Sequence, residues 1–539
     1  MEKEVNKLRG GYYTPDAIAR FIAEWAITEN DVSILEPSCG DGSLIKSSRD
    51  RLIQLGVKEQ EIFRKVTGIE LFEKEAKKAQ SYGANIVCSD FFSFYKNNID
   101  QKRRFDVVIG NPPFIRYQNF NEEYRKIAFE LTQKAGVELN RLTNIWIPFL
   151  ILSTECLSEN GKLGMVIPAE LFQVDYAADT RMYLSDHFDH LTVITFRKLL
   201  FDGAQQEVIL LLGEKRSEVK GIEVYELKDA SELSSFTQKK KSEIKNLAKT
   251  HDKWVRYYLS NSEIDLLNKV EMLPSVIRTT DLFETNVGVV SGQNKFFVID
   301  RTTVEQWSLE KAVSPIIGRS EQLKGIVLTE DDFKDLVNKR KKVHLFTPED
   351  VELNQLTANE QEYIHNGEKQ GFHEGYKCRI RKRWYIVPQS WKPDAFLLRQ
   401  INRYPKLVLN QVDATNTDTL HKVRFLPNVE GDKVSAAFIN SFTFAQCEVT
   451  GRSYGGGVLT FEPGEIRRIA IPMGHYEKLD VNIVDSFIRE GEIIKALDYV
   501  DQIVLEEGAG LTREDVERLR GIWQKLSDRR MGRREDFKE

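Results

Sequence analysis

The first 215 residues alternate between short apolar runs and stretches with helical spacing, and this alternation limits the folds open to the chain more than any other feature. Strands joined by helical crossovers form a mainly parallel sheet covered by helices on both faces. We therefore predict an α/β fold with a doubly wound, seven-stranded sheet, whose last two strands could form a hairpin. The predicted strands lie in DVSILEP, FRKVTGIE, ANIVCSD, FDVVIG, GKLGMVIP, LTVITF and EVILLLG.

Four of these strands are followed by residues suited to binding a ligand, and ligands bind beyond the carboxyl ends of the strands in such sheets. Each feature alone has an ordinary structural explanation, such as a helix cap or a tight turn, but four in order are a stronger signal. Ile45 stands where a dinucleotide-binding turn needs its third glycine, which argues against an oxidoreductase. The four sets are Glu36-Pro37-Ser38-Cys39-Gly40-Asp41-Gly42, Glu70, Asp90-Phe91 and Asn111-Pro112-Pro113-Phe114.

The last of these sets cannot continue a strand, because proline has a fixed φ and no N–H. The segment should be a stiff bend whose carbonyl groups await hydrogen-bond donors. Earlier in the chain, Thr14 is expected to cap a helix that has Pro15 at its first position.

Composition narrows the class of protein. Hydrophobic residues make up 41% of the 539 residues and charged residues 29%, so the chain is globular, with no bilayer span and no secretory signal. The five cysteines are far apart, which predicts neither a metal site nor disulfides and favours a reducing cytoplasm. A net charge of -5 argues against a nucleic-acid partner unless basic residues cluster locally.

Such clusters occur in the second half of the chain. Strand alternation would place Arg379, Arg381 and Arg383 on one face, beside Lys382 and two aromatic residues, and a row of this kind suits phosphates. FLLRQINRYP is expected to be helical. Beyond residue 476 the pattern is helical, with Thr512 and Asp515 resembling a capping box; whether this part caps the second domain or contacts another subunit is open. The expected domains are 1–245, 246–475 (α+β) and 476–539.

The motifs in the first 215 residues resemble the gamma class of S-adenosylmethionine-dependent DNA adenine-N6 methyltransferases of restriction–modification systems. The matching stretches are GGYYTP, ILEPSCGDGSL, VTGIEL, CSDFF, VIGNPPFIRY, GKLGMVIPAELF and FDGAQQEVILLL. The one departure is Phe114, where the family often has tyrosine, and stacking needs only the ring. The resemblance implies a Rossmann-like class I methyltransferase fold, a second domain that recognises double-stranded DNA, and no metal.

The resemblance also implies roles for individual residues. The side-chain oxygen of Asn111 and the carbonyl of Pro112, in the stiff loop that Pro113 completes, would accept hydrogens from the amino group of a flipped adenine. Phe114 and Phe201 would contact the base. S-adenosylmethionine would lie with its methionine end near Tyr13, Thr14, Glu36, Ser38 and Gly40, its ribose at Glu70, and its adenine at Asp90 and Phe91.

Three alternative functions share some of these features. A release-factor glutamine methyltransferase uses the same loop but is a much shorter chain. A non-catalytic DNA-binding specificity subunit would not need intact Asn111, Glu70 and Asp90. An RNA adenine methyltransferase is compatible with the catalytic motif itself. Because GGYYTP begins at Gly10, we expect no fused nuclease, and any cleavage would need a separate cognate restriction endonuclease.

Overall fold

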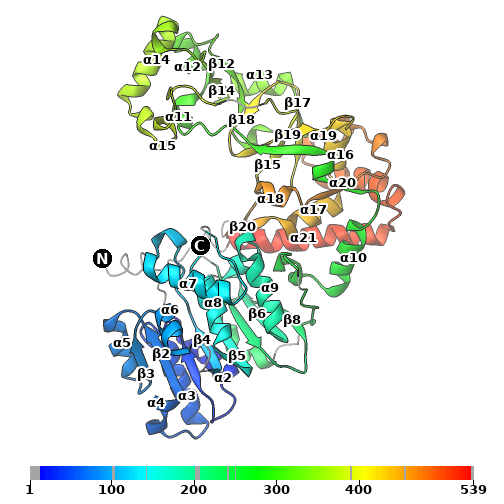
Figure 1. Ribbon diagram of the computed structural model, residues 1–539. Coiled ribbons are helices and arrows are strands. Elements are labelled where there is room, and N and C mark those ends of the chain that lie inside the picture. The colour runs from blue at the N-terminus through cyan, green and yellow to red at the C-terminus, as the bar shows by residue number, and fades with distance from the viewer. Residues whose placement is uncertain are drawn as a thin grey trace. The chain divides into compact units, whose positions relative to one another are not determined.

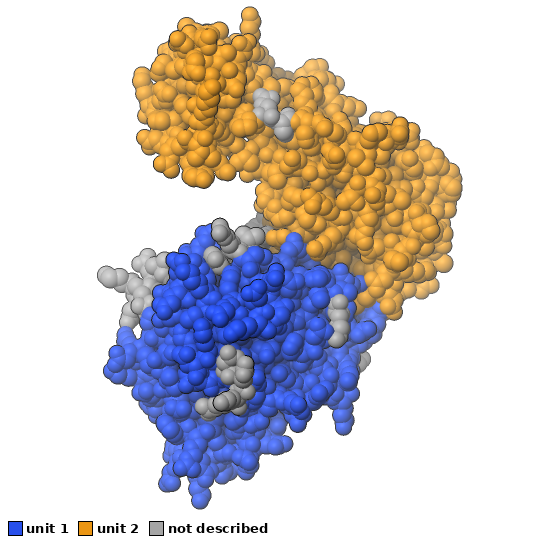
Figure 2. All heavy atoms as spheres, in the orientation of Figure 1, with its two compact units in different colours: residues 1–261, 536–539 blue, residues 262–535 orange. Residues whose placement is uncertain are grey.

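The computed structural model describes residues 13–99, 104–140, 143–198, 200, 207–238, 242–248, 250–388, 391–454 and 457–535. The chain divides into two compact units, of which the first comprises residues 1–261 and the second residues 262–535 (Figure 2). Each unit has its own hydrophobic core.

The first unit is built on one eight-stranded sheet with the order β3-β2-β1-β4-β5-β7-β6-β8. All pairs are parallel except those that β7 makes with β5 and β6. The strands are β1 (Ile34–Glu36), β2 (Val66–Glu70), β3 (Asn85–Cys88), β4 (Phe105–Gly110), β5 (Leu157–Pro168), β6 (His190–Phe196), β7 (Val208–Glu214) and β8 (Gly221–Leu227).

Helices cover both faces of this sheet (Figure 1). α3 contacts both α2 and α5, and α8 contacts both α7 and α9. Every residue of β1, β2 and β6 is buried, as expected for strands covered on both sides. The helices are α2 (Asp16–Ala26), α3 (Ser43–Gln54), α4 (Ile62–Lys65), α5 (Glu73–Gln80), α6 (Phe91–Phe94), α7 (Glu122–Lys134), α8 (Trp146–Glu155) and α9 (Ala178–His187).

The doubly wound, mainly parallel sheet is confirmed, and so is the antiparallel pairing of β6 with β7. The strand count is wrong by one, because β8 adds to the sheet parallel to β6. β8 lies in the 216–260 segment, whose lysine-rich composition suggests a linker. It is an edge strand with four half-exposed residues in its centre, so it lacks the continuous apolar run that marks the buried strands.

The second unit contains four smaller sheets. Their strand orders are β10-β19-β15-β17-β13, β11-β14-β12-β18, β16-β21-β20 and β22-β9. The strands are β9 (Val276–Arg278), β10 (Phe283–Val287), β11 (Val298–Ile299), β12 (Val313–Ile317), β13 (Val327–Leu328), β14 (His344–Phe346), β15 (Ala395–Leu398), β16 (Gln400–Ile401), β17 (Leu407–Asn410), β18 (Thr415–Asn416), β19 (Leu420–Phe425), β20 (Arg452–Tyr454), β21 (Val458–Thr460) and β22 (Ala470–Pro472).

The helices of this unit are distributed along its whole length. They are α10 (Asn261–Glu271), α11 (Asn294–Phe297), α12 (Arg301–Trp307), α13 (Glu330–Asn338), α14 (Ala358–Lys369), α15 (Tyr376–Arg379), α16 (Gly431–Ala437), α17 (Ser441–Thr450), α18 (Pro463–Ile466), α19 (Val481–Glu490), α20 (Ile493–Asp501) and α21 (Arg513–Glu535). The expected helix in FLLRQINRYP is wrong: this stretch forms β15 and β16, because a short apolar run cannot distinguish a helix from a strand that is buried between neighbours.

Candidate active site

A cavity of about 350 Å³ lies at the carboxyl ends of β1, β2, β3 and β4. All four sequence segments predicted to meet at this edge contribute to it, so the sheet topology brings them together. The lining residues are Tyr13, Pro37, Ser38, Gly40, Ile69, Glu70, Leu71, Phe72, Glu75, Ser89, Asp90, Phe91, Asn111, Pro113, Ile115, Asn119, Phe120, Asn121, Tyr124 and Phe149.

Glu70, the last residue of β2, connects the glycine-rich turn after β1 to the end of β2 by a hydrogen bond. Its carboxylate accepts hydrogen bonds from the amide of Gly40 (2.9 Å) and from the amide of Phe72 (2.8 Å). Gly40 has a φ of +52°, a conformation that favours glycine. Burial raises the pKa of Glu70 although the amide hydrogen bonds act in the opposite direction.

Glu36 lies directly behind this turn and is 2% exposed. Burial, together with the negative charges of Asp41 and Glu70, raises its pKa well above the usual range. Its Oε2 atom has no hydrogen-bond partner among the described residues. A positively charged group nearby would stabilise the ionised form of this buried carboxylate.

Asp90 and Phe91 form the next part of the rim. The Asp90 carboxylate caps α6 by accepting from the amide of Ser93 (2.8 Å), and burial raises its pKa. Phe91 stacks on Phe149, with ring centres 5.2 Å apart. Asp90 therefore does serve as a helix cap, but it also lines the cavity.

Asn111 follows β4 and is connected to two other segments. Its side-chain Nδ2 donates to Thr14 Oγ1 (3.2 Å), and its backbone carbonyl accepts from Ser38 Oγ (3.3 Å). Thr14 was expected to cap α2, which is wrong: the capping position is Pro15, with no side-chain cap. The Thr14 hydroxyl instead accepts from the side-chain Nδ2 of Asn111, and Thr14 is not among the lining residues.

The remaining residues of the loop differ in their surroundings. Pro112 is buried, Pro113 lines the cavity, and Phe114 is half-buried against the hydrophobic core of the first unit. Phe201 lies outside the described residues.

Several lining residues were missed by the sequence interpretation. Phe72 stands two residues after Glu70 and is 42% exposed, and Leu71 between them is 41% exposed. Phe120 stands between Asn119 and Asn121 before α7. An exposed ring after an acid and a ring between two amides were the available signals, but neither belongs to a recognised motif.

In the described part of the chain, the ionisable carboxylates that line the cavity are not balanced by basic side chains. Its lining contains Glu70, Glu75 and Asp90 but no lysine, arginine or histidine among the described residues. Phosphate groups require basic side chains or a helix amino end directed at them. The lining therefore suits an uncharged or cationic ligand with a planar ring, and it does not suit the pyrophosphate of a dinucleotide.

The predicted arginine row in the second unit is wrong. Residues 376–379 form the short helix α15, and turns follow it, so no strand places Arg379, Arg381 and Arg383 on one face. The amide of Arg381 donates to the carbonyl of Cys378 (3.1 Å), which curls the chain. Arg383 instead forms ion pairs with Asp350 (2.6 Å) and Glu352 (2.7 Å). Strand alternation cannot predict these pairs, because both acids come from an earlier segment of the chain.

A doubly wound sheet with this acidic and aromatic cavity at its carboxyl edge, and an Asn-Pro-Pro-Phe loop beside it, defines a class I methyltransferase dependent on S-adenosylmethionine. A family model for N-6 DNA methylases matches residues 2–281, just over half of the chain. The chain belongs to the N-6 DNA methylase family. A second model, the C-terminal domain of Type II methyltransferase M.Eco57I, matches residues 251–505.

Individual relatives agree with this assignment. The Type II methyltransferase M.AccI of Acinetobacter calcoaceticus is 24% identical over 479 residues, which cover 85% of this chain and 84% of that protein. M.HincII of Haemophilus influenzae is 25% identical over 229 residues, covering 42% and 41%. The structure of the Type IIL restriction-modification enzyme MmeI in complex with DNA has a TM-score of 0.60 at 11% identity, covering 95% of this chain and 75% of that one; this likeness concerns the fold.

The protein is an adenine-specific DNA methyltransferase of the restriction–modification type. This confirms the expected enzyme class and makes DNA, rather than RNA, the substrate. The family assignment as an enzyme also argues against the alternative of a non-catalytic DNA-binding specificity subunit. Within the described residues, no helix is long and apolar enough to cross a bilayer, and no group of three or more His, Cys, Asp or Glu side chains is arranged to hold a metal ion.

Proposed function

We propose that the cavity at the carboxyl edge of the sheet binds S-adenosylmethionine and that Asn111 positions the N6 amino group of a flipped adenine beside it. The observation that carries this proposal is the lining, which combines three acids and several rings with no basic side chain among the described residues. When bound, the cofactor supplies an electrophilic methyl group on a positively charged sulfur.

The residues present fit such a cofactor. Glu36 does not itself line the cavity, but Pro37 and Ser38, which follow it, do. Its buried oxygen has no partner among the described residues, and Asp41 and Glu70 add negative charge, so a cationic group nearby would offset the cost of burying the Glu36 carboxylate. In this proposal Glu70 would accept from ribose hydroxyls, and Asp90 from an adenine amino group. Phe91 and Tyr13 line the cavity as apolar surfaces.

Asn111 would act through its amide oxygen. An exocyclic adenine nitrogen is a poor nucleophile because its lone pair is delocalised into the ring. Two acceptors directed at its hydrogens, Asn111 Oδ1 and the Pro112 carbonyl, would favour a tetrahedral nitrogen with a localised lone pair. The bond from Nδ2 to Thr14 supports this role, because it turns the Oδ1 end of the amide away from Thr14.

Phe114 and Phe201 are proposed to contact the flipped base. Phe114 is half-buried, so part of its ring is already held by the core while part remains accessible. Extruding a base costs about a few kcal/mol of stacking and pairing, which ring contacts offset. The roles of both rings stay predictions.

We further propose that the partner is double-stranded DNA, that the second unit selects the target sequence, and that any cleavage belongs to a separate restriction endonuclease. The match of residues 251–505 to the C-terminal domain of M.Eco57I supports a specialised second unit. A cytoplasmic location remains a prediction.

The test is Asn111→Ala. Methyl transfer to plasmid DNA from a strain lacking modification should fall by about 10² or more, the scale of a lost electrostatic contact. Cofactor and DNA binding should persist, and nucleoside mass spectrometry of the wild-type product should show N6-methyldeoxyadenosine. Asn98→Ala, an exposed asparagine outside the cavity, is the matched control and should retain its rate. Full activity of Asn111→Ala contradicts the mechanism.

A further inference from the structure

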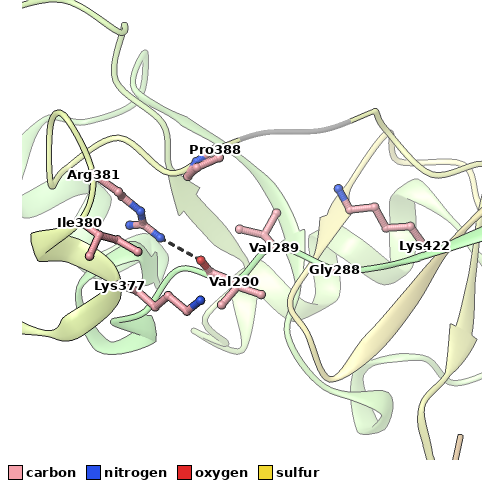
Figure 3. Close-up of a pocket in the computed structure, with 8 residues that line it drawn as sticks. All are labelled: Gly288, Val289, Val290, Lys377, Ile380, Arg381, Pro388 and Lys422. Atoms are coloured by element: carbon pink, nitrogen blue, oxygen red, sulfur yellow. Dashed lines mark hydrogen bonds between the residues drawn. The ribbon is translucent and has the colours of Figure 1, made fainter. Parts of the chain in front are cut away.

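A second cavity, of about 430 Å³, lies wholly within the second unit (Figure 3). Its walls come from three segments: the chain just after β10, residues 376–388, which we call the α15 region, and β19. The lining residues are Gly288, Val289, Val290, Lys377, Ile380, Arg381, Pro388 and Lys422.

The charge of this cavity is opposite to that of the catalytic cavity. Three of its lining residues are basic and none is acidic. Arg381 is held in place, since its Nη2 donates to the carbonyl of Val290 (2.9 Å) and its guanidinium lies over the ring of Phe297 (5.7 Å). Lys422 is 1% exposed, and burial lowers its pKa. An anion in the cavity would favour the charged form of both side chains.

The α15 region beside the cavity carries further basic residues. Lys377, Arg379 and Lys382 are exposed, and none of the three forms an ion pair within the described part of the chain. Arg383 differs from these three residues because it forms ion pairs with Asp350 and Glu352. In a chain with a net charge of -5, three neighbouring cations without acidic partners form a local positive patch.

Large apolar side chains are exposed among these cations. Tyr376 is 66% exposed and Ile380 is 62% exposed, and a spacing of four residues places them on the same side of a helical turn. Val290, on the cavity wall, is 44% exposed. Apolar side chains interleaved with unpaired cations suit a nucleic acid, which offers phosphates together with sugar and base surfaces.

The geometry points to the α15 region and its cavity as a contact surface for the DNA duplex. Lys377, Arg379 and Lys382 contact backbone phosphates, Lys422 and Arg381 supply the positive wall of the cavity, and Tyr376 with Ile380 lies against sugars or bases. The assignment rests on the proposed function, in which double-stranded DNA is the partner. It keeps Arg379, Arg381 and Lys382 from the predicted row without the strand geometry, and it leaves Arg383 out. Lys377 and Lys422 are added as further basic residues.

The test is the triple variant K377Q/R379Q/K382Q, measured by fluorescence anisotropy on a labelled 30-base-pair duplex at several salt concentrations. Each lost phosphate contact should lower the magnitude of d log K/d log[salt] by about 0.9, so the slope should fall by roughly 2.7. All three side chains are exposed, so the fold should persist. R379Q alone, with a decrease of about 0.9, serves if the triple variant does not fold.

The matched control is K334Q/K478Q/K495Q, which makes the same charge change in the same unit on exposed lysines that have acidic partners. Its slope should stay at the wild-type value. A second variant, Y376S/I380S, should weaken binding about tenfold without changing the slope, because it removes no charge.

A wild-type slope in the triple variant, or an equal decrease in the control, overturns the inference. Failure of the proposed function is distinguishable, because it would appear in the wild-type protein as absent methyl transfer to DNA. Methyl transfer by the wild type with an unchanged slope in the triple variant would count only against this surface.

Discussion

At the scale of single residues, the hydroxyl of Thr14 is the clearest case of a side chain with an unexpected task. Its position before α2 is typical of a helix cap, yet it accepts from the side-chain Nδ2 of Asn111 instead. Since Thr14 does not line the cavity, we infer that it positions Asn111 rather than touching the cofactor.

Replacing Thr14 separates these two roles. Thr14→Val keeps the shape but removes the acceptor, so kcat should fall about tenfold, the value of one hydrogen bond, with little change in KM for S-adenosylmethionine. Thr14→Ser keeps the hydroxyl and should stay within about twofold of the wild type. Steady-state kinetics at saturating DNA measures both constants. A raised KM with unchanged kcat would instead assign Thr14 to cofactor binding.

At the scale of elements, the C-terminal helices belong to the second unit and pack against its other helices. α21 packs on α17, where the rings of Trp523 and Phe444 are 5.1 Å apart. Arg530, 3% exposed, pairs with the buried Glu448 (2.7 Å). The amide of Asp515 donates to Thr512 (3.1 Å), as its place in a capping box predicts.

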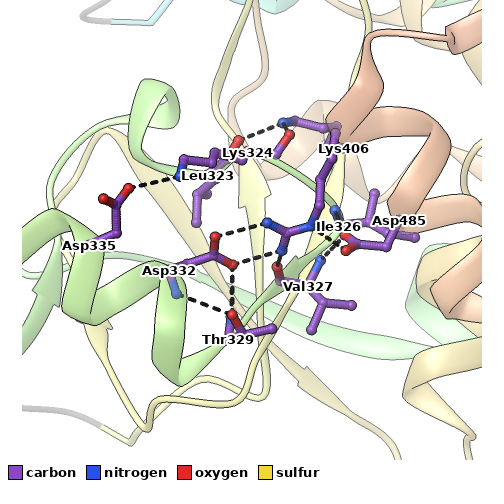
Figure 4. Close-up of polar contacts among 10 residues, drawn as sticks. Leu323, Lys324, Ile326, Val327, Thr329, Asp332, Asp335, Lys406 and Asp485 are labelled. Carbon is purple, nitrogen blue, oxygen red and sulfur yellow. Dashed lines mark hydrogen bonds and ion pairs between the residues drawn. The ribbon is translucent and has the colours of Figure 1, made fainter.

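α19 is attached to the five-stranded sheet by one polar cluster, shown in part in Figure 4. Asp485 accepts from the amides of Ile326 (2.7 Å) and Val327 (2.9 Å). Arg489 donates to both carboxylate oxygens of Asp332 (2.8 and 2.7 Å). These hydrogen bonds lower the pKa of Asp332 to about 2.

Arg489→Met should destabilise the second unit by about 3 kcal/mol, because it leaves two partly buried carboxylates without their partner. The folded pKa of Asp332 lies below its usual 3.8, so the pair's contribution is present above that pH and is lost as the pH falls through about 2. Urea unfolding at pH 7 measures the main effect. Arg513→Met is the control: Arg513 has three acidic partners, one more than Arg489, but its side chain is half exposed, so its loss should cost about 1 kcal/mol or less. Equal losses would contradict the argument.

At the scale of the whole molecule, the two units have separate cores and separate cavities. We expect calorimetry of the full chain to show two transitions. S-adenosylmethionine at about 100 times its dissociation constant should stabilise the first unit by about 2.7 kcal/mol and raise one Tm by about 5 °C or more. The other transition should not move.

Asp90→Ala should lose most of this shift, while the second transition stays in place as an internal control. A shift of both transitions would show that cofactor binding stabilises the second unit as well. An unchanged shift in Asp90→Ala would remove Asp90 from the cofactor site.

The sequence by itself determined the central sheet of the first unit and the neighbourhood of its cavity. Seven of the eight strands follow from apolar runs, because strands buried on both faces must be apolar at nearly every position. Glu70, Asp90 and Asn111 were recognisable because they stand directly after such runs, and parallel strands bring their carboxyl ends to one edge.

Only the tertiary structure decided the partners of individual polar side chains. Thr14 lies 97 positions from Asn111, and Arg383 lies 33 and 31 positions from Asp350 and Glu352. Strand alternation and helix capping describe near neighbours in the chain, whereas a hydroxyl or guanidinium bonds to whichever group the fold places beside it. The location of the cavity was therefore open to prediction from local pattern, while the hydrogen bonds and ion pairs around it depended on contacts between distant segments.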